Sequence, residues 1–350
     1  MRQRGWAGTR LAVAILVVGG LLAAQGASSA ATGASSGAPG APSHIVAIPG
    51  GAHGIGFDDM GYVPELHRIV VPAGQTGALA LIDPQSLALT LIPGISTPRR
   101  TARGHGEGTT SATYAHGFLF ASDRDTHQVV IVDPRGHAVL GRVPLSGCPD
   151  YLRYDPIVRE LWVTEPGARQ IEIFGVDFSP RPTLRRVATI PVPGGPESLI
   201  IDAKRGIAYT NLWKRDTLVI GVADRRIEAR WPDGCEGPRG LAWDPQSRFL
   251  FVGCAEGKVS VLDAGHGGRV LGTATTGRGV DIIAYDASRH RVYAPGARSA
   301  TMTTLHVDPQ GHPTLEAVHR TAHGAHCVAV APTGRAFVCD PRHGRVLVFD

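Results

Sequence analysis

From residue 43 onward, short apolar runs alternate with turns rich in glycine and proline. Each run holds about four mostly apolar residues, and many runs end in an aspartate before the next turn. Runs of this length between glycine, proline and aspartate are typical of β-strands, because a helix needs a longer periodic segment. The pattern predicts an all-β protein built from many short strands.

One phrase recurs along the chain: a polar residue, a short apolar run and often an aspartate. Seven copies are found, at residues 52–58, 104–110, 149–155, 196–202, 238–244, 280–286 and 325–331. Each copy is followed by a second strand and then by a third, the third strands lying at 79–83, 129–133, 171–175, 218–222, 259–263, 303–307 and 346–350. Periods of 42 to 52 residues with several strands each are the signature of β-propeller blades. The sequence therefore predicts a seven-bladed β-propeller.

The two ends of the chain are predicted to complete one blade together. The last copy stops at its third strand, 346–350, and lacks an outer strand. Residues 44–50 (HIVAIPG) read like the outer strand of another blade at 187–194 (VATIPVPG). We expect 44–50 to pair antiparallel with 346–350, which closes the ring and removes an exposed sheet edge.

Three segments carry a resemblance to a known family: GCEGPRGLAWDPQSRFLFVGCAEGKVSVLD (234–263), GGPESLIIDAKRGIAYTN (194–211) and GCPDYLRYDP (147–156). With them, the chain resembles the YVTN-repeat propellers, and in particular the exported YncE-like proteins. The resemblance implies a seven-bladed propeller over most of the chain. It implies little about chemistry, because propellers host binding proteins, lyases, lactonases and oxidoreductases alike.

The N-terminus has the features of a secretory signal peptide. Arg2, Arg4 and Arg10 precede an apolar run at 11–24, and small residues at 28–30 supply a cleavage site. An uncleaved membrane anchor is the alternative, but the run of 14 residues falls short of the roughly 20 that span a bilayer.

The predicted domain organisation follows from that leader. It consists of a signal peptide at 1–30, a flexible Gly/Ala/Ser/Pro linker at 31–43 and one propeller domain at 44–350. We expect an exported protein, periplasmic or extracellular, with no membrane span after cleavage.

Composition excludes several other classes. With 45 Gly, 26 Pro, 43% hydrophobic and 19% charged residues, the chain is neither a helical bundle nor disordered. The net charge of +5 falls to +2 once the basic residues of the first 30 positions are set aside. A nucleic-acid partner is therefore not expected. Separately, we expect the protein to be a monomer.

Five cysteines lie in the propeller region, and none forms a C-x-x-C motif. Cys235 precedes the inner strand of the fifth blade and Cys254 ends the strand beside it, so hairpin pairing brings the two together. Cys327 and Cys339 hold comparable positions in the last blade. We expect these two disulfides and an unpaired Cys148, with buried free thiols as the alternative.

No nucleophile elbow, zinc-protease helix, phosphate loop or dinucleotide fingerprint occurs in the chain. Any site must therefore be assembled from equivalent positions on different blades. The residue that opens the innermost strand is polar in all copies, and the column reads His53, His105, Asp150, Glu197, Arg239, Asp281 and His326. Since innermost strands surround the channel, we expect these side chains to form a ring at one channel mouth.

The predicted ring has two interpretations. It is either polar lining of a wet channel, with Arg239 paired to Glu197 and Asp281, or a binding site for a small-molecule or protein ligand. The first interpretation requires no further function of these residues.

The ring also suggests a divalent metal site. His53, His105 and His326 lie on three consecutive blades once the ring closes, and three imidazoles suit zinc or copper. Asp150 and Glu197 continue that arc and could orient the imidazoles or act as general base.

Two functions follow from these interpretations. The leading hypothesis is an exported propeller that binds a ligand or protein partner through its channel face, without chemistry of its own. The alternative is a metal-dependent hydrolase or lyase, lactonase-like, that uses the ring. A redox metal site is less favoured, because no Cys or Met stands at the ring.

Overall fold

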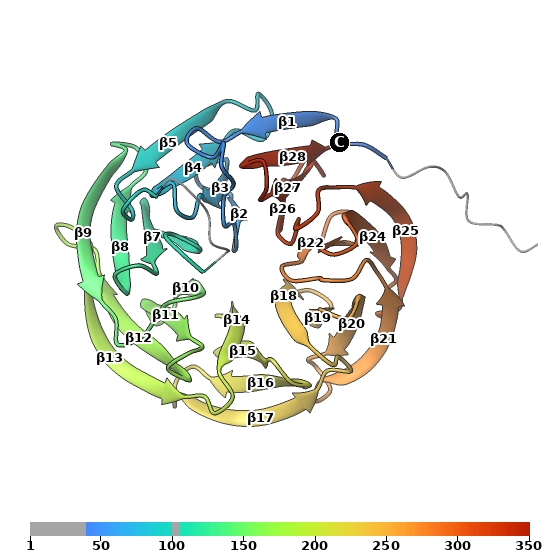
Figure 1. Cartoon of the computed structure of the whole chain (residues 1–350). Helices are drawn as coiled ribbons and strands as arrows, with labels where there is room; N and C mark the ends of the chain where they lie inside the picture. Colours follow the sequence, from blue (N-terminus) through green and yellow to red (C-terminus); the bar gives the residue numbers. More distant parts are fainter. Residues whose placement is uncertain (1–39, 100–105) are drawn as a thin grey trace, which may run out of the picture. The chain divides into compact units, whose positions relative to one another are not determined.

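The computed structural model describes residues 40–99 and 106–350. These residues form 28 strands in seven four-stranded antiparallel sheets, arranged as blades around a central channel (Figure 1). The prediction of an all-β, seven-bladed propeller is confirmed. In this described part, no helix is long and apolar enough to cross a membrane. The predicted signal peptide and residues 31–39 of the predicted linker lie outside the described residues.

In blades one to four, the strands run outward from the channel in sequence order. Blade one holds β2 (Gly61–Val63), β3 (Arg68–Pro72), β4 (Ala78–Ile82) and β5 (Leu89–Pro93). Blade two holds β6 (Ala112–Ala115), β7 (Phe118–Asp123), β8 (Gln128–Asp133) and β9 (Ala138–Pro144). Blade three holds β10 (Leu152–Asp155), β11 (Glu160–Glu165), β12 (Gln170–Asp177) and β13 (Thr183–Pro191). Blade four holds β14 (Pro196–Asp202), β15 (Ile207–Leu212), β16 (Asp216–Gly221) and β17 (Arg226–Pro232).

The remaining blades follow the same order, except that the last one takes its outer strand from the start of the chain. Blade five holds β18 (Pro238–Asp244), β19 (Phe249–Cys254), β20 (Lys258–Asp263) and β21 (Arg269–Thr275). Blade six holds β22 (Ala284–Asp286), β23 (Arg291–Gly296), β24 (Thr301–Val307) and β25 (Pro313–Arg320). Blade seven holds β26 (Val328–Val330), β27 (Ala336–Asp340), β28 (Arg345–Phe349) and β1 (His44–Ala47).

The N-terminal strand closes the ring as predicted. β1 lies antiparallel to β28, with His44 opposite Val348 and Ala47 opposite Arg345. In Figure 1 the blue β1 lies beside the red β28. Because β28 pairs with β27 on one side and with β1 on the other, its outer edge is not exposed.

Pairing also extends into the end of the predicted linker. The Ser43 amide donates to the Val348 carbonyl at 2.8 Å, and Gly40 forms a bridge with His319. The packed chain therefore begins by Gly40, slightly before the predicted boundary at residue 44, because the backbone continues to find hydrogen-bond partners on blades six and seven.

Two of the seven innermost strands lie later in the chain than predicted. In blade one the copy at 52–58 is a loop, and β2 begins at Gly61. In blade two the copy at 104–110 also precedes the strand, β6. Ile55 and Phe57 of the first loop are fully buried, so loop residues that pack into the core imitate the apolar run of a strand.

Several histidines that the sequence places in turns adopt left-handed backbone conformations. The φ angles are 47° at His116, 53° at His127, 51° at His137 and 53° at His290. Histidine is one of the non-glycine residues enriched in this region of backbone space. These four positions are accounted for by turn geometry rather than by ligand binding.

Two cysteine pairs lie at disulfide distance. The Cα atoms of Cys235 and Cys254 are 5.5 Å apart, and those of Cys327 and Cys339 are 5.6 Å apart. In each pair one cysteine lies shortly before the innermost strand of its blade and the other lies in the second strand, as expected from the hairpins. Cys148 is an unpaired, half-buried thiol.

Peptide mapping without reduction is expected to recover the pairs Cys235–Cys254 and Cys327–Cys339, with Cys148 alkylated in the denatured, unreduced protein. Each cross-link closes a loop of 19 or 12 residues, so its removal is expected to cost about 3 kcal/mol of stability. The Cys148→Ser variant is the control, and its map should show the same two linked peptides. A peptide joining Cys148 to Cys235 would contradict this pairing.

Candidate functional site

Equivalent positions at the start of the innermost strands define a ring at one mouth of the channel. We align the blades by counting residues backward along each innermost strand, starting from the hairpin that connects it to the second strand of its blade. The observed strand pairing fixes the position of each hairpin. The ring so defined consists of Asp58, Thr110, Asp150, Glu197, Arg239, Asp281 and His326. Five of the seven predicted residues hold these positions, and two do not.

The two exceptions are histidines of the misaligned copies. His53 lies in an exposed turn ahead of the ring, and Asp58 takes its place in blade one. His105 lies outside the described residues, and Thr110 holds the ring position of blade two. The physical reason is the same displacement of the first two innermost strands.

Backbone hydrogen bonds between neighbouring blades hold parts of the ring in place. The amide of Asp59 donates to the Thr110 carbonyl, that of Gly240 to the Asp281 carbonyl, and that of Ile282 to the His326 carbonyl, each at 2.9 Å. In each of these three pairs of neighbouring blades, the residue that follows the ring residue of one blade donates its amide hydrogen bond to the carbonyl of the ring residue on the other blade. The ring backbone is thereby fixed before any ligand binds.

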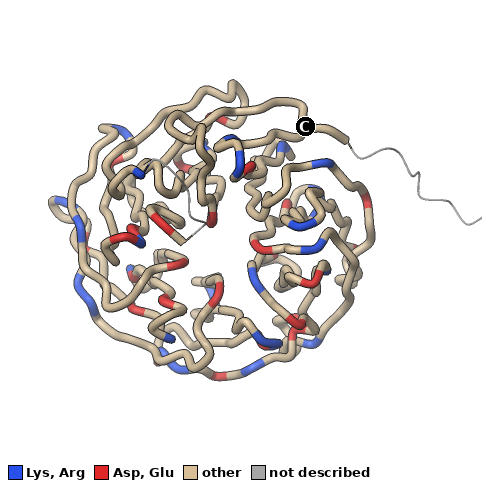
Figure 2. Tube along the Cα trace, viewed as in Figure 1, with Lys and Arg blue, Asp and Glu red and all other residues tan. Residues whose placement is uncertain are grey.

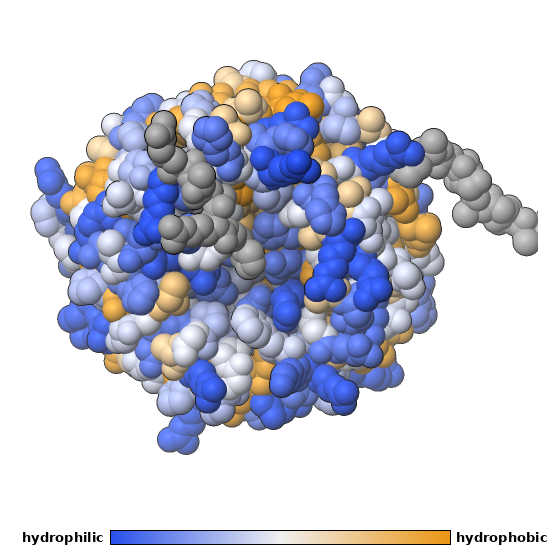
Figure 3. Space-filling model, viewed as in Figure 1, coloured by the Kyte–Doolittle hydropathy of each residue, from blue (hydrophilic) through white to orange (hydrophobic). Residues whose placement is uncertain are grey.

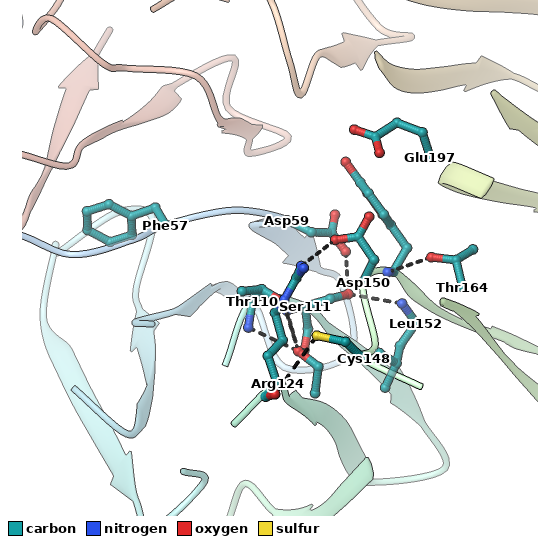
Figure 4. A network of polar contacts seen from close by, with 12 residues as sticks. Phe57, Asp59, Thr110, Ser111, Arg124, Cys148, Asp150, Leu152, Thr164 and Glu197 are labelled. Atoms are coloured by element: carbon teal, nitrogen blue, oxygen red, sulfur yellow. Dashed lines mark hydrogen bonds and ion pairs between the residues drawn. The ribbon is translucent and has the colours of Figure 1, made fainter. Parts of the chain in front are cut away.

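Asp150 is a buried acid of the ring. Its side chain accepts a hydrogen bond of 2.7 Å from Arg124, which comes from the β7–β8 turn of the preceding blade (Figure 4). Burial, followed by the negative charge of Asp58, raises the pKa of Asp150 to about 7; Asp281 adds to this effect and Arg124 opposes it. Asp150 therefore titrates in the neutral pH range.

Glu197 lies at the start of β14 and shares the same environment. Burial, followed by the charges of Asp150 and Asp281, raises the pKa of Glu197 to about 8, while Trp213 and Arg239 act in the opposite direction. The Trp213 indole N–H donates to the Glu197 carboxylate.

Trp213 forms an exposed platform at the rim of the ring. Its side chain is 53% exposed, and the Arg239 guanidinium lies 5.3 Å from the centre of its ring. Exposed tryptophan and arginine are the residue types most often found at the energetic centre of binding interfaces. The rim beside Glu197 thus has the composition of a contact surface.

A second polar layer lies immediately below the ring. Arg153 of β10 makes two hydrogen bonds to the Asp59 carboxylate, at 2.6 and 2.9 Å. The Ser111 hydroxyl donates to the same carboxylate at 2.6 Å and accepts from the Leu152 amide at 3.1 Å. Figure 4 shows Asp59 and Ser111 beside the Arg124–Asp150 pair. This layer joins blades one, two and three.

The structure does not present His326 as a metal ligand. Its Nδ1 lies 2.7 Å from the Gly324 carbonyl oxygen, and its Nε2 lies 2.8 Å from the Phe57 carbonyl oxygen. Both ring nitrogens are thus engaged with the backbone, whereas a metal ligand needs one nitrogen lone pair for the ion. His53 lies in an exposed turn and His105 lies outside the described residues, so the metal set of His53, His105 and His326 stays a prediction.

Two clusters in the described residues bring possible ligand atoms close together. One contains His326 with Cys327 and Cys339, and the other contains Glu256 with Cys235 and Cys254. In both clusters the sulfur atoms belong to the disulfide-distance pairs. Neither cluster therefore offers thiolates for a metal while those bonds are formed.

The ring mouth is rich in negative charge. Carboxylates at ring positions come from blades one, three, four and six, and Figure 2 shows acidic segments facing the central opening. Figure 3 shows hydrophilic residues predominating around the centre of the face in view. The positive charges of Arg124 and Arg239 act to lower the pKa values of Asp150 and Glu197, respectively.

Comparison with known proteins identifies the fold class only. No protein-family model and no curated protein matches the chain. A chain in a crystal structure of the mitotic checkpoint complex is similar with a TM-score of 0.71 and 12% identity, covering 94% of this chain and 97% of that chain. Kuenenia stuttgartiensis hydrazine synthase gives a TM-score of 0.68 and 14% identity, over 85% of this chain and 96% of that chain.

A third similar structure is the β-propeller domain of Cps50 (Swd1) from Myceliophteria thermophila. Its TM-score is 0.68 at 12% identity, and the match covers 88% of this chain and 99% of that domain. Identities this low establish a shared fold and no shared activity. The chain is therefore a seven-bladed β-propeller.

Stability is expected to fall as the pH rises from about 5 to about 9. The folded-state pKa values of Asp150 (about 7) and Glu197 (about 8) lie above those of the unfolded chain. The native state therefore binds more protons than the unfolded state in this window, and unfolding becomes easier as these protons are lost. We expect a loss of several kcal/mol in the free energy of unfolding across this window, measured by urea titration. Glu197→Gln should flatten the slope; a rise in stability over the same range would contradict these assignments.

Proposed function

We propose that the protein is an exported binding propeller of the YVTN-repeat, YncE-like type, and that its ring mouth takes a positively charged group of a ligand or protein partner. The observation that carries the proposal is the gathering of Asp58, Asp150, Glu197 and Asp281 at one mouth. Export is supported by the sequence of the first 30 residues and by two cysteine pairs at disulfide distance.

The preference for a cation rests on the electrostatics of these four acids. The charges of Asp58 and Asp281 help to raise the pKa of Asp150, and those of Asp150 and Asp281 help to raise the pKa of Glu197. An ammonium or guanidinium group placed among them would relieve this repulsion and favour their ionised forms. The exposed Trp213 at the rim adds a large apolar contact surface beside Glu197.

The test uses two matched peptides, a short glycine/serine peptide with a central lysine and the same peptide with glutamine. Calorimetry at about pH 9 should show the lysine peptide binding at least about tenfold tighter than the glutamine peptide. Near pH 6 the difference should shrink, because protons then occupy Asp150 and Glu197.

Two variants locate the binding site. Glu197→Gln should abolish the preference for lysine, whereas Glu65→Gln, which removes an exposed acid after β2 at the other mouth, should leave it intact. Equal affinity for both peptides, or an equal loss in both variants, would contradict a cation site at the ring mouth.

A metal-dependent hydrolase or lyase is the second candidate, favoured by the near-neutral pKa of Asp150, which suits a general acid or base. Its metal part rests on the predicted set of His53, His105 and His326, in which His326 has both ring nitrogens near backbone carbonyl oxygens. Elemental analysis of untagged protein after added zinc or copper and desalting tests it directly. Less than about 0.1 metal per chain would exclude such a site, since a three-histidine site should survive desalting.

A further inference from the structure

A separate cavity occupies the channel below the ring. It has a volume of about 470 Å³ and is lined by the innermost strands of blades one, two, five, six and seven together with Arg153 of blade three. None of the seven ring residues lines it, and the Asp59–Arg153 pair lies at its inner end. Its size falls in the range of small-molecule pockets.

Small residues create the space opposite Arg153. In the observed register, Gly61, Ala284 and Ala329 hold the same level of the innermost strands as Arg153. A Cβ atom added at Gly61 would meet no atom within 4 Å, and its φ angle lies outside the left-handed region. The backbone therefore does not require glycine at this position, and the missing side chain leaves open volume.

The inner end of the cavity offers hydrogen-bond donors. Arg153 donates from Nη1 to Asp59 and to the Leu152 carbonyl, and from Nη2 to Asp59. A guanidinium carries five N–H groups, so among the described residues these bonds account for three and leave two for a ligand. Asp59, by contrast, already accepts from Arg153 and from Ser111. The free hydrogen-bonding capacity here favours an acceptor atom on the ligand.

The local charge disfavours an anionic ligand despite Arg153. The Asp59–Arg153 pair is neutral as a unit, and the surrounding field is negative: burial, followed by the charges of Asp58 and Asp281, raises the pKa of Tyr151 well above its ordinary value. A carboxylate ligand would meet this field. A cation would gain from this field, but the Asp59 carboxylate already accepts three hydrogen bonds and the Arg153 guanidinium would face the ligand.

We propose that this cavity binds a small, uncharged molecule whose carbonyl or amide oxygen accepts hydrogen bonds from Arg153, with its apolar body against Leu241, Ile283 and Val328. These aliphatic side chains lie on blades five, six and seven and line the cavity. The ligand's oxygen accepts hydrogen bonds from the guanidinium, and its apolar body packs against the aliphatic lining without burying a further charge. This site is independent of the cation site proposed for the ring mouth.

Three isosteric probes distinguish the charge classes: benzamide is neutral, benzamidine is a cation and benzoate is an anion. Ligand-observed NMR should show benzamide binding at least about fivefold tighter than either charged probe. Gly61→Leu fills the open volume and should weaken benzamide binding at least about tenfold.

Gly167→Leu is the matched control. Gly167 lies in the turn between β11 and β12, and a Cβ there also meets nothing within 4 Å, so binding should be unchanged. Thermal melting of both variants checks that each is folded. The proposal is overturned if benzamide does not bind at millimolar concentration, if a charged probe binds as tightly, or if folded Gly61→Leu keeps full affinity.

Discussion

Deleting residues 44–50 is expected to lower the melting temperature by about 10 °C or more. The deletion removes β1, bares the outer edge of β28 and exposes apolar surface that Val46 and Ile48 now cover. Two buried aliphatic side chains contribute about 1.5 to 3 kcal/mol each, and the lost ladder adds to this. In a domain of about 310 residues each kcal/mol corresponds to about 1.5 °C. Differential scanning calorimetry measures the effect.

A pair of point variants separates burial from chain length in the same strand. Val46 is 8% exposed and Ile45 is 52% exposed, and both lie in β1. Val46→Ser should lower the melting temperature by several degrees, whereas Ile45→Ser should change it little. Equal small effects of both variants, together with a small effect of the deletion, would show that β1 does not close the ring.

Breaking the Asp59–Arg153 pair is expected to cost about 3 kcal/mol of stability. Arg153→Met removes a cation that makes two hydrogen bonds to a carboxylate only 8% exposed. The remaining negative charge would be left without its counter-ion next to Asp58 and Asp150, and this uncompensated charge is the source of the cost. Urea titration of the variant at about pH 7 gives the loss directly.

The double variant Asp59→Asn/Arg153→Met isolates the charge. It removes both ions and should recover about 2 kcal/mol relative to Arg153→Met alone, because no buried charge is then left unpaired. If the double variant is as unstable as the single one, or if Arg153→Met costs less than about 1 kcal/mol, the pair does not stabilise the channel wall.

The repeat pattern was sufficient to predict blade number, strand order and ring closure, because each blade repeats its strands between strong turn signals. It misplaced the innermost strands of blades one and two, and in blade one Ile55 and Phe57 are buried without being in a strand. The hairpin after β2 has the same spacing as the hairpin after β22: Val63 pairs with Arg68, and Asp286 pairs with Arg291. Aligning the copies by this hairpin would have placed Asp58 at the ring.

The chemistry of the ring was less predictable than its position. Arg124 and Trp213 come from turns between the second and third strands, so they do not appear in the column of innermost strands. The engagement of both His326 nitrogens with backbone carbonyls likewise depends on distances between blades. Sequence identifies which residues open each strand, but contacts across blades decide whether a histidine is available to a metal.

The central claim is that ionised Asp150 and Glu197 receive a cation at the ring mouth, and proton release on binding tests it most directly. At about pH 7.5, pKa values of about 7 and about 8 leave about one proton in total on these two acids. Calorimetry of the lysine peptide in two buffers with different ionisation enthalpies should therefore show the release of up to about one proton per bound peptide. Binding without proton release, or with proton uptake, would contradict the account.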